Sequence, residues 1–255
     1  MNVYKTSQVR NVVFLGHGGA GKTTLAEAMA YATGVITRMG SVDNGNTISD
    51  YDSEEIKRKF SINAAVIPIE WNGLKINILD APGYFDFVGQ TEDAMSVADA
   101  AVIVVNGKAG LEVGTIKAWE ICERRKIPRI FFITGMDDPN AKYMETVKQL
   151  KETFGKQIAP FHLPIIEDGI LTGYVNVVKM GGRKFVGDNG EYVERDIPDN
   201  LESDLIPCRE QLMEAVAESD EELMDKYFSG EEFSNEEISK ALRKSVISCD
   251  IVPVQ

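Results

Sequence analysis

The sequence predicts an α/β fold: a mostly parallel β-sheet with helices on both faces, and an inserted α+β subdomain. Two observations predict the sheet. Short apolar runs alternate with helical patterns along the first part of the chain, and a glycine-rich loop separates the first run from the first helix. The subdomain is predicted from a change near Gln157, where short strand-like runs and then three capped helices follow. With 255 residues the chain can bury a substantial core.

The first strand and helix are predicted from the apolar run Val12–Leu15 and the segment that follows it. Apolar residues recur there at helical spacing, namely Leu25, Ala28, Met29 and Ala32. Gly34 is a suitable stop for this helix. Residues 35–63 are polar, glycine-rich and weakly periodic, so we expect them to form a mobile loop.

A hairpin is predicted from the runs Val66–Trp71 and Lys75–Leu79, because Asn72-Gly73 between them favours a tight turn. Pro68 has no N–H to donate, so the first of these strands should lie at a sheet edge. The next predicted elements are a helix capped by Thr91 and a buried strand over 100–105. A helix with Ile116, Trp119 and Cys122 on one face follows. The last two elements of this part are a strand Arg129–Ile133 and a helix Ala141–Phe154. Trp71 and Trp119 are expected in the core.

The organisation changes after residue 157. Ile170–Lys179, Arg183–Val186 and Glu191–Glu194 indicate a small meander, with turns at Gly181-Gly182 and at Asp188-Asn189-Gly190. Three helices follow, with capping-box spacing at Asp199/Glu202, Ser219/Glu222 and Ser234/Glu237, and then a returning strand Ile251–Val254. We therefore divide the chain into a core over 1–157, an inserted α+β subdomain over 158–245, and a returning strand over 246–255.

The net charge of −13 is unevenly distributed. Residues 1–140 carry 17 acidic and 14 basic side chains, and residues 141–255 carry 23 and 13. An acidic surface is unsuited to phosphate backbones, so we expect no direct nucleic-acid contact from the inserted subdomain. The capping pairs explain much of this asymmetry, because acidic residues stabilise the first turn of a helix.

The composition also indicates in which cellular compartment the protein works. The three cysteines, Cys122, Cys208 and Cys249, are far apart and form no CxxC pair, which is typical of the reducing cytosol. No apolar run approaches the length of a membrane helix, and the N-terminus lacks a signal-peptide core. We therefore expect a cytoplasmic protein that does not contact membranes.

The strongest motif lies between the first strand and the first helix. Gly16 is followed at the required spacing by Gly21-Lys22-Thr23, which is the GxxxxGK(S/T) pattern of a phosphate-binding loop. Glycine lets backbone N–H groups approach a phosphate, lysine reaches the β- and γ-phosphates, and the hydroxyl ligates Mg²⁺. The residues predicted to bind the nucleotide phosphates are His17, Gly18, Gly19, Ala20, Gly21, Lys22, Thr23 and Thr24. The alternative is a plain glycine-rich turn.

A second motif narrows the class of nucleotide enzyme. An apolar strand ends in Asp80, and Ala81-Pro82-Gly83 follows it. Asp80 is predicted to hold Mg²⁺ at the strand end, and the backbone N–H of Gly83 to approach the γ-phosphate. A DxPG sequence at this distance after a phosphate-binding loop is typical of GTPases, so GTP and GDP are the predicted ligands.

The two motifs resemble those of the translational GTPases, specifically the elongation factor G family. The loop GHGGAGKTT is similar to that family's GHxDxGKTT, and the run from Asp80 to Phe87 is similar to DTPGHVDF. Residues 53–61 lie where the family has its ERGIT switch segment, and Glu221–Val254 resembles its inserted subdomain. The resemblance implies a P-loop GTPase fold and GTP hydrolysis during translocation on the ribosome. It also implies Mg²⁺ ligands Thr23, Ser61 and Asp80, and catalytic roles for Lys22, Gly83 and Tyr84.

The sequence departs from the family at four points. Thr134-Gly135-Met136-Asp137 stands where the family reads guanine with Asn-Lys-x-Asp, so Thr134 and Asp137 are the predicted base contacts. Tyr84 replaces a histidine that orients the attacking water, and Gly19 replaces an aspartate of the loop. The family's last guanine loop should follow Gln255, so we expect the natural protein to be longer.

These departures leave three alternatives open. A ribosome-protection or release-type GTPase would share the fold and the motifs. A nucleotide-dependent binding module with little hydrolysis is suggested by Tyr84 and by Thr134-Gly135. Relaxed base specificity is a further possibility, because Asp137 could instead belong to a simple turn with Asp138 and Pro139.

Overall fold

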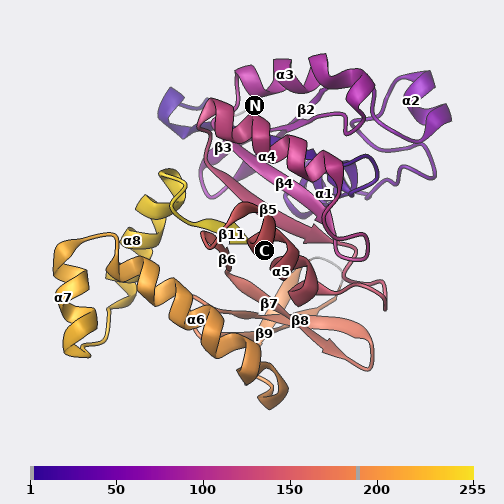
Figure 1. The fold of residues 1–255 in the computed structure, drawn as a ribbon. Helices are drawn as coiled ribbons and strands as arrows, with labels where there is room; N and C mark the ends of the chain where they lie inside the picture. Colours follow the sequence, from indigo (N-terminus) through magenta and orange to yellow (C-terminus); the bar gives the residue numbers. More distant parts are fainter. Residues whose placement is uncertain (1–2, 188–189) are drawn as a thin grey trace. The chain divides into compact units, whose positions relative to one another are not determined.

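A computed structural model describes residues 3–187 and 190–255 (Figure 1). The chain divides into two compact units, Met1–Ile127 and Pro128–Gln255, and each is described by itself. Asp188 and Asn189 of the turn predicted at 188–190 lie outside the described residues. The predicted division into a core over 1–157 and an insert over 158–245 stays a prediction.

The first unit is built on a mixed sheet of strand order β2-β3-β1-β4. β1 (Val9–Gly16) pairs in parallel with both β3 (Leu74–Asp80) and β4 (Ala100–Asn106). β2 (Ala65–Trp71) pairs antiparallel with β3 through the predicted Asn72-Gly73 turn, in which both residues have positive φ. The parallel sheet, the hairpin and the edge position of Pro68 are therefore confirmed.

The helices of this unit are α1 (Lys22–Ala32), α2 (Ser53–Arg58), α3 (Val88–Ser96) and α4 (Val113–Arg125), with short 3₁₀ turns at Thr6–Gln8 and Phe85–Phe87. A buried cluster joins the sheet to α1: Phe14, Ala26, Ala30, Ile67, Ile69 and Ile78. Burying this apolar face fixes α1 directly after β1, so the glycine-rich loop is held at the C-terminal end of a parallel strand.

Three details of the first unit differ from the sequence predictions. Residues 35–63 contain helix α2, whose N-cap Asp52 forms a capping box with Glu55. Thr91 does not begin a helix but lies within α3, where its hydroxyl donates to the carbonyl of Pro82. Trp71, the last residue of β2 before the hairpin turn, is 55% exposed and not part of the core.

The second unit contains two sheets. β5 (Arg129–Thr134), β11 (Val252–Val254) and β6 (Ile158–Pro160) pair in parallel in that order, with β11 in the middle. The other sheet is an antiparallel meander of order β10-β9-β8-β7. Its strands are β7 (His162–Glu167), β8 (Ile170–Asn176), β9 (Gly181–Val186) and β10 (Glu191–Arg195). The α+β character expected for this part of the chain is confirmed.

The helices of the second unit are α5 (Tyr143–Phe154), α6 (Glu202–Ala217), α7 (Glu221–Ser229) and α8 (Asn235–Ile247), with a 3₁₀ turn at Asp199–Leu201. α6 contacts both α7 and α8, as the orange and yellow end of the chain shows in Figure 1. Buried Leu205, Leu212 and Val216 on α6 and Ile238 and Leu242 on α8 are part of its core.

Several predictions for this unit need correction. β6 and β7 are additional strands, and Gly181-Gly182 open β9 instead of forming the turn, which occupies residues 177–180. Only the Ser234/Glu237 capping box forms as predicted. α7 is capped by Asp220 rather than by Ser219, and α6 has no side-chain cap.

Among the described residues, no helix is both long and apolar enough to cross a membrane. Within the same residues, Cys122, Cys208 and Cys249 are not joined by disulfides.

Candidate functional site

The phosphate-binding motif forms a loop between β1 and α1. Gly16, the last residue of β1, has φ of 138°, and a Cβ there would lie 2.3 Å from the carbonyl oxygen of Val104. Only glycine fits this position. Gly21 adopts a left-handed conformation as the N-cap of α1, which begins at Lys22. The first-turn N–H groups of α1 have no intrahelical acceptor and carry the positive end of the helix dipole, which is a suitable arrangement for an anion.

Lys22 is buried beneath this loop, with 6% of its surface exposed. Its Nζ donates hydrogen bonds to the carbonyl oxygens of Gly16 at 3.1 Å and His17 at 2.8 Å. Burial lowers the pKa of Lys22 to about 8, and the nearby charges of Asp80, Glu112 and Asp50 act in the opposite direction. A buried ammonium in this position is well placed to neutralise a phosphate.

The three predicted magnesium ligands lie together. The Thr23 hydroxyl donates to Oδ2 of Asp80 at 2.7 Å and lies 3.2 Å from the Ser61 hydroxyl. Burial raises the pKa of Asp80 to about 6, although the Thr23 hydrogen bond and the Lys22 charge lower it. Oδ1 of Asp80 is buried without a hydrogen-bond partner among the described residues. Two hydroxyls and an incompletely satisfied carboxylate are hard oxygen donors, so the set fits a hydrated Mg²⁺.

Asp50 is a member of this cluster that the sequence analysis missed. Its side chain is 5% exposed and accepts a 2.7 Å hydrogen bond from the Ser61 hydroxyl. Burial raises its pKa, and the Ser61 hydrogen bond lowers it. Asp50 comes from the segment expected to be a loop, and no motif marked it in the sequence.

Gly83 and Tyr84 lie against the phosphate-binding loop. A Cβ on Gly83 would lie 2.4 Å from Nζ of Lys22 and 2.7 Å from the backbone nitrogen of Gly18, so glycine is required there. The Tyr84 ring covers Gly18, where a Cβ would lie 2.7 to 2.9 Å from ring carbons. The same ring packs against Phe60, with centroids 4.7 Å apart.

His17 has a different environment from the one expected of a ligand. Its Nε2 lies 3.5 Å from Glu112, and its Nδ1 is buried without a hydrogen-bond partner in the described structure. Its carbonyl, by contrast, accepts from Lys22. The backbone of His17 therefore contributes more to the loop than its imidazole does.

Most of the predicted phosphate and metal residues line a cavity of about 310 Å³ in the first unit, although His17, Ala20 and Asp80 do not. The lining combines the loop residues Gly18, Gly19, Gly21, Lys22, Thr23 and Thr24 with Ser41, Val42, Asp43, Asp50, Lys59, Phe60, Ser61, Gly83 and Tyr84. The structure thus brings together the predicted phosphate and metal residues within one unit.

The predicted base contacts belong to the second unit. Thr134 is the last residue of β5, and Asp137 is exposed in the turn that follows. In that turn the N–H of Asp138 donates to the carbonyl of Gly135 at 3.1 Å. The carboxylate of Asp137 thus stands at the C-terminal end of a parallel strand, outside the sheet ladder.

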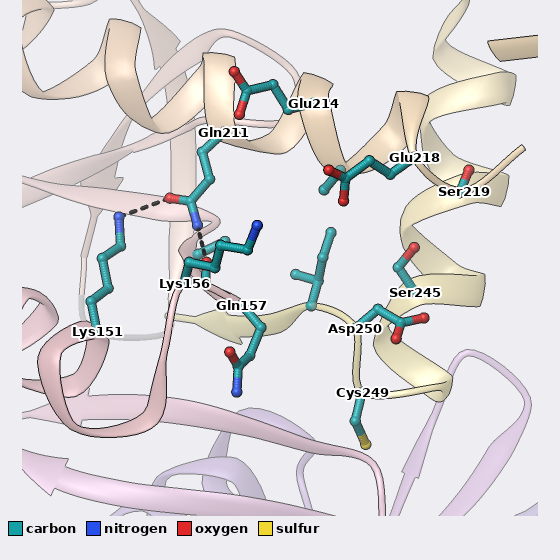
Figure 2. Close-up of a pocket in the computed structure, with 13 residues that line it drawn as sticks. Lys151, Lys156, Gln157, Gln211, Glu214, Glu218, Ser219, Ser245, Cys249 and Asp250 are labelled. Carbon is teal, nitrogen blue, oxygen red and sulfur yellow. Dashed lines mark hydrogen bonds between the residues drawn. The ribbon is translucent and has the colours of Figure 1, made fainter. Parts of the chain in front are cut away.

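A larger hollow of about 740 Å³ lies in the second unit, between α6, the α5–β6 connection and the segment before β11 (Figure 2). There Lys151 donates to the side chain of Gln211, which in turn donates to the carbonyl of Lys156. Glu214 and Glu218 line it from α6. None of the residues predicted for the nucleotide site lines this hollow.

Comparison with known proteins gives consistent matches. Residues 7–249 match the family described as the elongation factor Tu GTP binding domain. The chain is 37% identical over 248 residues to elongation factor G of Thermotoga maritima, covering 97% of this chain and 36% of that protein. Elongation factor G of Thermotoga petrophila matches with the same identity and coverage. A crystal structure of a Thermus thermophilus protein superposes with a TM-score of 0.90 at 36% identity, covering 97% of this chain and 37% of that one. The chain therefore spans about a third of the length of these relatives.

Proposed function

Because the chain belongs to the family of elongation factor Tu GTP-binding domains, we propose that it binds and hydrolyses GTP as part of a translation factor resembling elongation factor G. The observation that carries the proposal is the buried Lys22 beside the Thr23–Ser61–Asp80 cluster, at the start of a helix. GTP and GDP are the proposed ligands, and the ribosome is the proposed partner. We place the protein in the cytoplasm, where ribosomes work, with its acidic inserted subdomain away from nucleic acid.

Phosphate binding is assigned to the loop and to Lys22. Backbone N–H groups between His17 and Gly21 and in the first turn of α1, including Thr24, would donate to the phosphates. The N–H of Ala20 instead donates to the carbonyl of His17 at 3.2 Å. The Lys22 ammonium offsets the charge of the β- and γ-phosphates, and the Gly83 N–H approaches the γ-phosphate. Each group is positioned before nucleotide arrives, so it stabilises charge with little reorganisation.

Thr23, Ser61 and Asp80 would hold Mg²⁺, which when bound neutralises charge on the transferring phosphoryl group. Tyr84 would hold the attacking water through its hydroxyl. A phenol hydroxyl donates and accepts hydrogen bonds, so we assign Tyr84 to orienting water and not to taking its proton. Hydrolysis in isolation should accordingly be slow and depend on stimulation by a partner.

Base recognition is assigned to Asp137, with Thr134 beside it. A carboxylate accepting from the guanine N1–H and amino group makes a charge-assisted pair of about 1.5–3 kcal/mol. Calorimetric titration of GDP and ADP tests this. We expect GDP to bind more tightly, and Asp137→Ala to weaken GDP by about 10- to 150-fold while Glu145→Ala, an exposed change on α5, leaves it unaltered. Equal affinities for GDP and ADP would contradict the assignment.

Phosphate release by the protein that carries this chain, with and without ribosomes, tests the enzymatic proposal. Stimulation above the basal rate supports a ribosome-dependent GTPase. The packing of Tyr84 over Gly18 and against Phe60 favours one rival, a nucleotide-dependent binding module with little hydrolysis. Tight GDP binding without any ribosomal stimulation would support that rival.

A further inference from the structure

Glu27 is a buried carboxylate that the proposed mechanism does not use. It lies on α1 and is 1% exposed, although acidic side chains are rarely buried without partners. Its partners are backbone groups far along the chain. The N–H of Gly40 donates to Oε1 at 2.8 Å, and the N–H of Ile48 donates to Oε2 at 3.0 Å. One carboxylate thus holds both ends of the segment 40–48.

The segment held by Glu27 is compact. The side chain of Asn46 accepts from the N–H of Ser41 at 2.9 Å, and Ser41 accepts from Asn44 in turn. Gly40 approaches so closely that a Cβ would lie 2.7 Å from Oε1 of Glu27 and 2.3 Å from the carbonyl oxygen of Asn46. Loop 40–48 therefore docks on α1 through its backbone, and Ser41, Val42 and Asp43 from it line the nucleotide cavity.

The same helix face connects this anchor to the magnesium cluster. Thr23 and Glu27 are four residues apart on α1, so they share one face. Beyond loop 40–48, the N–H of Asp50 donates to the hydroxyl of Thr47, and Asp50 accepts from Ser61. Ser61 in turn lies 3.2 Å from Thr23. A continuous set of contacts thus leads from Glu27 through the loop and back to α1.

We propose that Glu27 is a positioning residue for nucleotide retention, which holds loop 40–48 over the site and thereby keeps Asp50 and Ser61 beside Thr23. The inference rests on the proposed function, because the nucleotide retained is the proposed GDP or GTP. The hydrogen bonds of Glu27 described above go to Gly40 and Ile48 of the loop, and its charge also acts on Asp50, whose pKa it raises. Losing its carboxylate leaves the buried N–H of Gly40 and the partly buried N–H of Ile48 without their acceptor, which weakens the closed loop and opens a route for nucleotide release.

The test uses Glu27→Gln, which keeps the side-chain size but replaces one acceptor oxygen by a donor facing an N–H group. Dissociation of fluorescent GDP is measured after adding excess unlabelled GDP and Mg²⁺. We expect release to accelerate by about tenfold or more, from the loss of a charged hydrogen bond. Trypsin cleavage after the exposed Arg38, followed by mass spectrometry, should accelerate in parallel. The matched control is Glu120→Gln on α4, which pairs with exposed Lys117 and should leave both rates unchanged.

Two comparisons separate this role from general instability. Cleavage after Arg183 in the second unit reports on unfolding elsewhere, and it should not change. Gly40→Ala disturbs the same contact from the loop side, so the double variant with Glu27→Gln should release GDP no faster than the faster single variant. The proposal would be overturned if Glu27→Gln released GDP and was cleaved after Arg38 at the same rates as the wild type. It would also be overturned if the effects of Glu27→Gln and Gly40→Ala on GDP release were fully additive in the double variant. Failure of the wild-type chain to bind GDP would instead contradict the proposed function, while the Arg38 comparison would still test the anchor.

Discussion

Asp80→Asn should stabilise the nucleotide-free protein while removing its response to magnesium. The carboxyl of Asp80 is 1% exposed, and burial raises its pKa from 3.8 to about 6. Raising this pKa from 3.8 to about 6 corresponds to about 3 kcal/mol. Between about pH 4 and pH 6 the native state binds more protons than the unfolded state, so the free energy of unfolding falls as the pH rises. Above pH 6 the whole cost of the buried charge is present.

Asparagine removes that charge and can still accept from the Thr23 hydroxyl. The gain in the free energy of unfolding is partly offset, because the variant lacks the negative charge of Asp80 that stabilises the Lys22 ammonium and raises its pKa. We therefore expect the free energy of unfolding at pH 8 in EDTA to rise by about 1–3 kcal/mol. With Mg²⁺ and GDP at about 100 times the Kd, the wild type should gain about 2.7 kcal/mol and Asp80→Asn much less.

Urea unfolding followed by far-UV circular dichroism measures the free energy of unfolding in EDTA. The same measurement with Mg²⁺ and GDP gives the stabilisation by the ligands. Asp93→Asn, an exposed change on α3, is the control and should alter neither value. A lower stability of Asp80→Asn than of the wild type in EDTA would refute the assignment of a costly buried charge. A full stabilisation by Mg²⁺ and GDP would refute the role of Asp80 in holding the metal.

Three further outcomes follow from the same site and from the core. Raising the pH from 7 to 9 should weaken GDP binding by about tenfold in calorimetry, because the Lys22 ammonium, with a pKa of about 8, loses its proton. A GDP affinity that does not change with pH would contradict the role of Lys22 in binding phosphate. Gly83→Ala should cost about 1–3 kcal/mol in GTP-analogue binding, since its Cβ would meet Lys22 and the backbone of Gly18; unchanged affinity would show that the loop yields. Leu212→Ala, fully buried on α6, should lower the free energy of unfolding by about 2–5 kcal/mol in urea, and a loss below about 1 kcal/mol would disprove its place in the core.

Local patterns predicted most of the sheet and the phosphate loop. Alternating apolar runs located β1, β3, β4 and β5, and Asn72-Gly73 placed a turn whose geometry depends on those two residues alone. The glycine and lysine spacing of the loop is likewise encoded within a few neighbouring residues. Such features need no information from distant parts of the chain, so a single sequence suffices for them.

The parts that were missed depend on contacts between distant segments. Helix α2 is an exception, because its capping box of Asp52 and Glu55 is a local signal that the sequence analysis missed in a helix of only six residues. Glu55 also accepts from the N–H groups of Ile62 and Asn63, just beyond the helix. Glu27 and Asp50 bind backbone or hydroxyl groups supplied by loops, and such donors leave no residue pattern. Trp71 is a large apolar residue of the kind usually found in a core, but it ends β2 beside the hairpin turn and is exposed.

The central position of β11 has a consequence for the order of folding. Val254 pairs with Phe131, and Val252 pairs with Ile158, so β11 fills the space between two strands that precede the whole meander and three helices. A nascent chain that had emerged only as far as Ile247 would hold β5 and β6 with unpaired backbone edges facing each other. Closure of that gap requires contacts of long sequence separation, which form slowly. The intervening helices and meander can fold first and bring β11 closer to β5 and β6. Pairing of β11 should therefore be a late step in the folding of the second unit, and slower synthesis of the last residues would delay it.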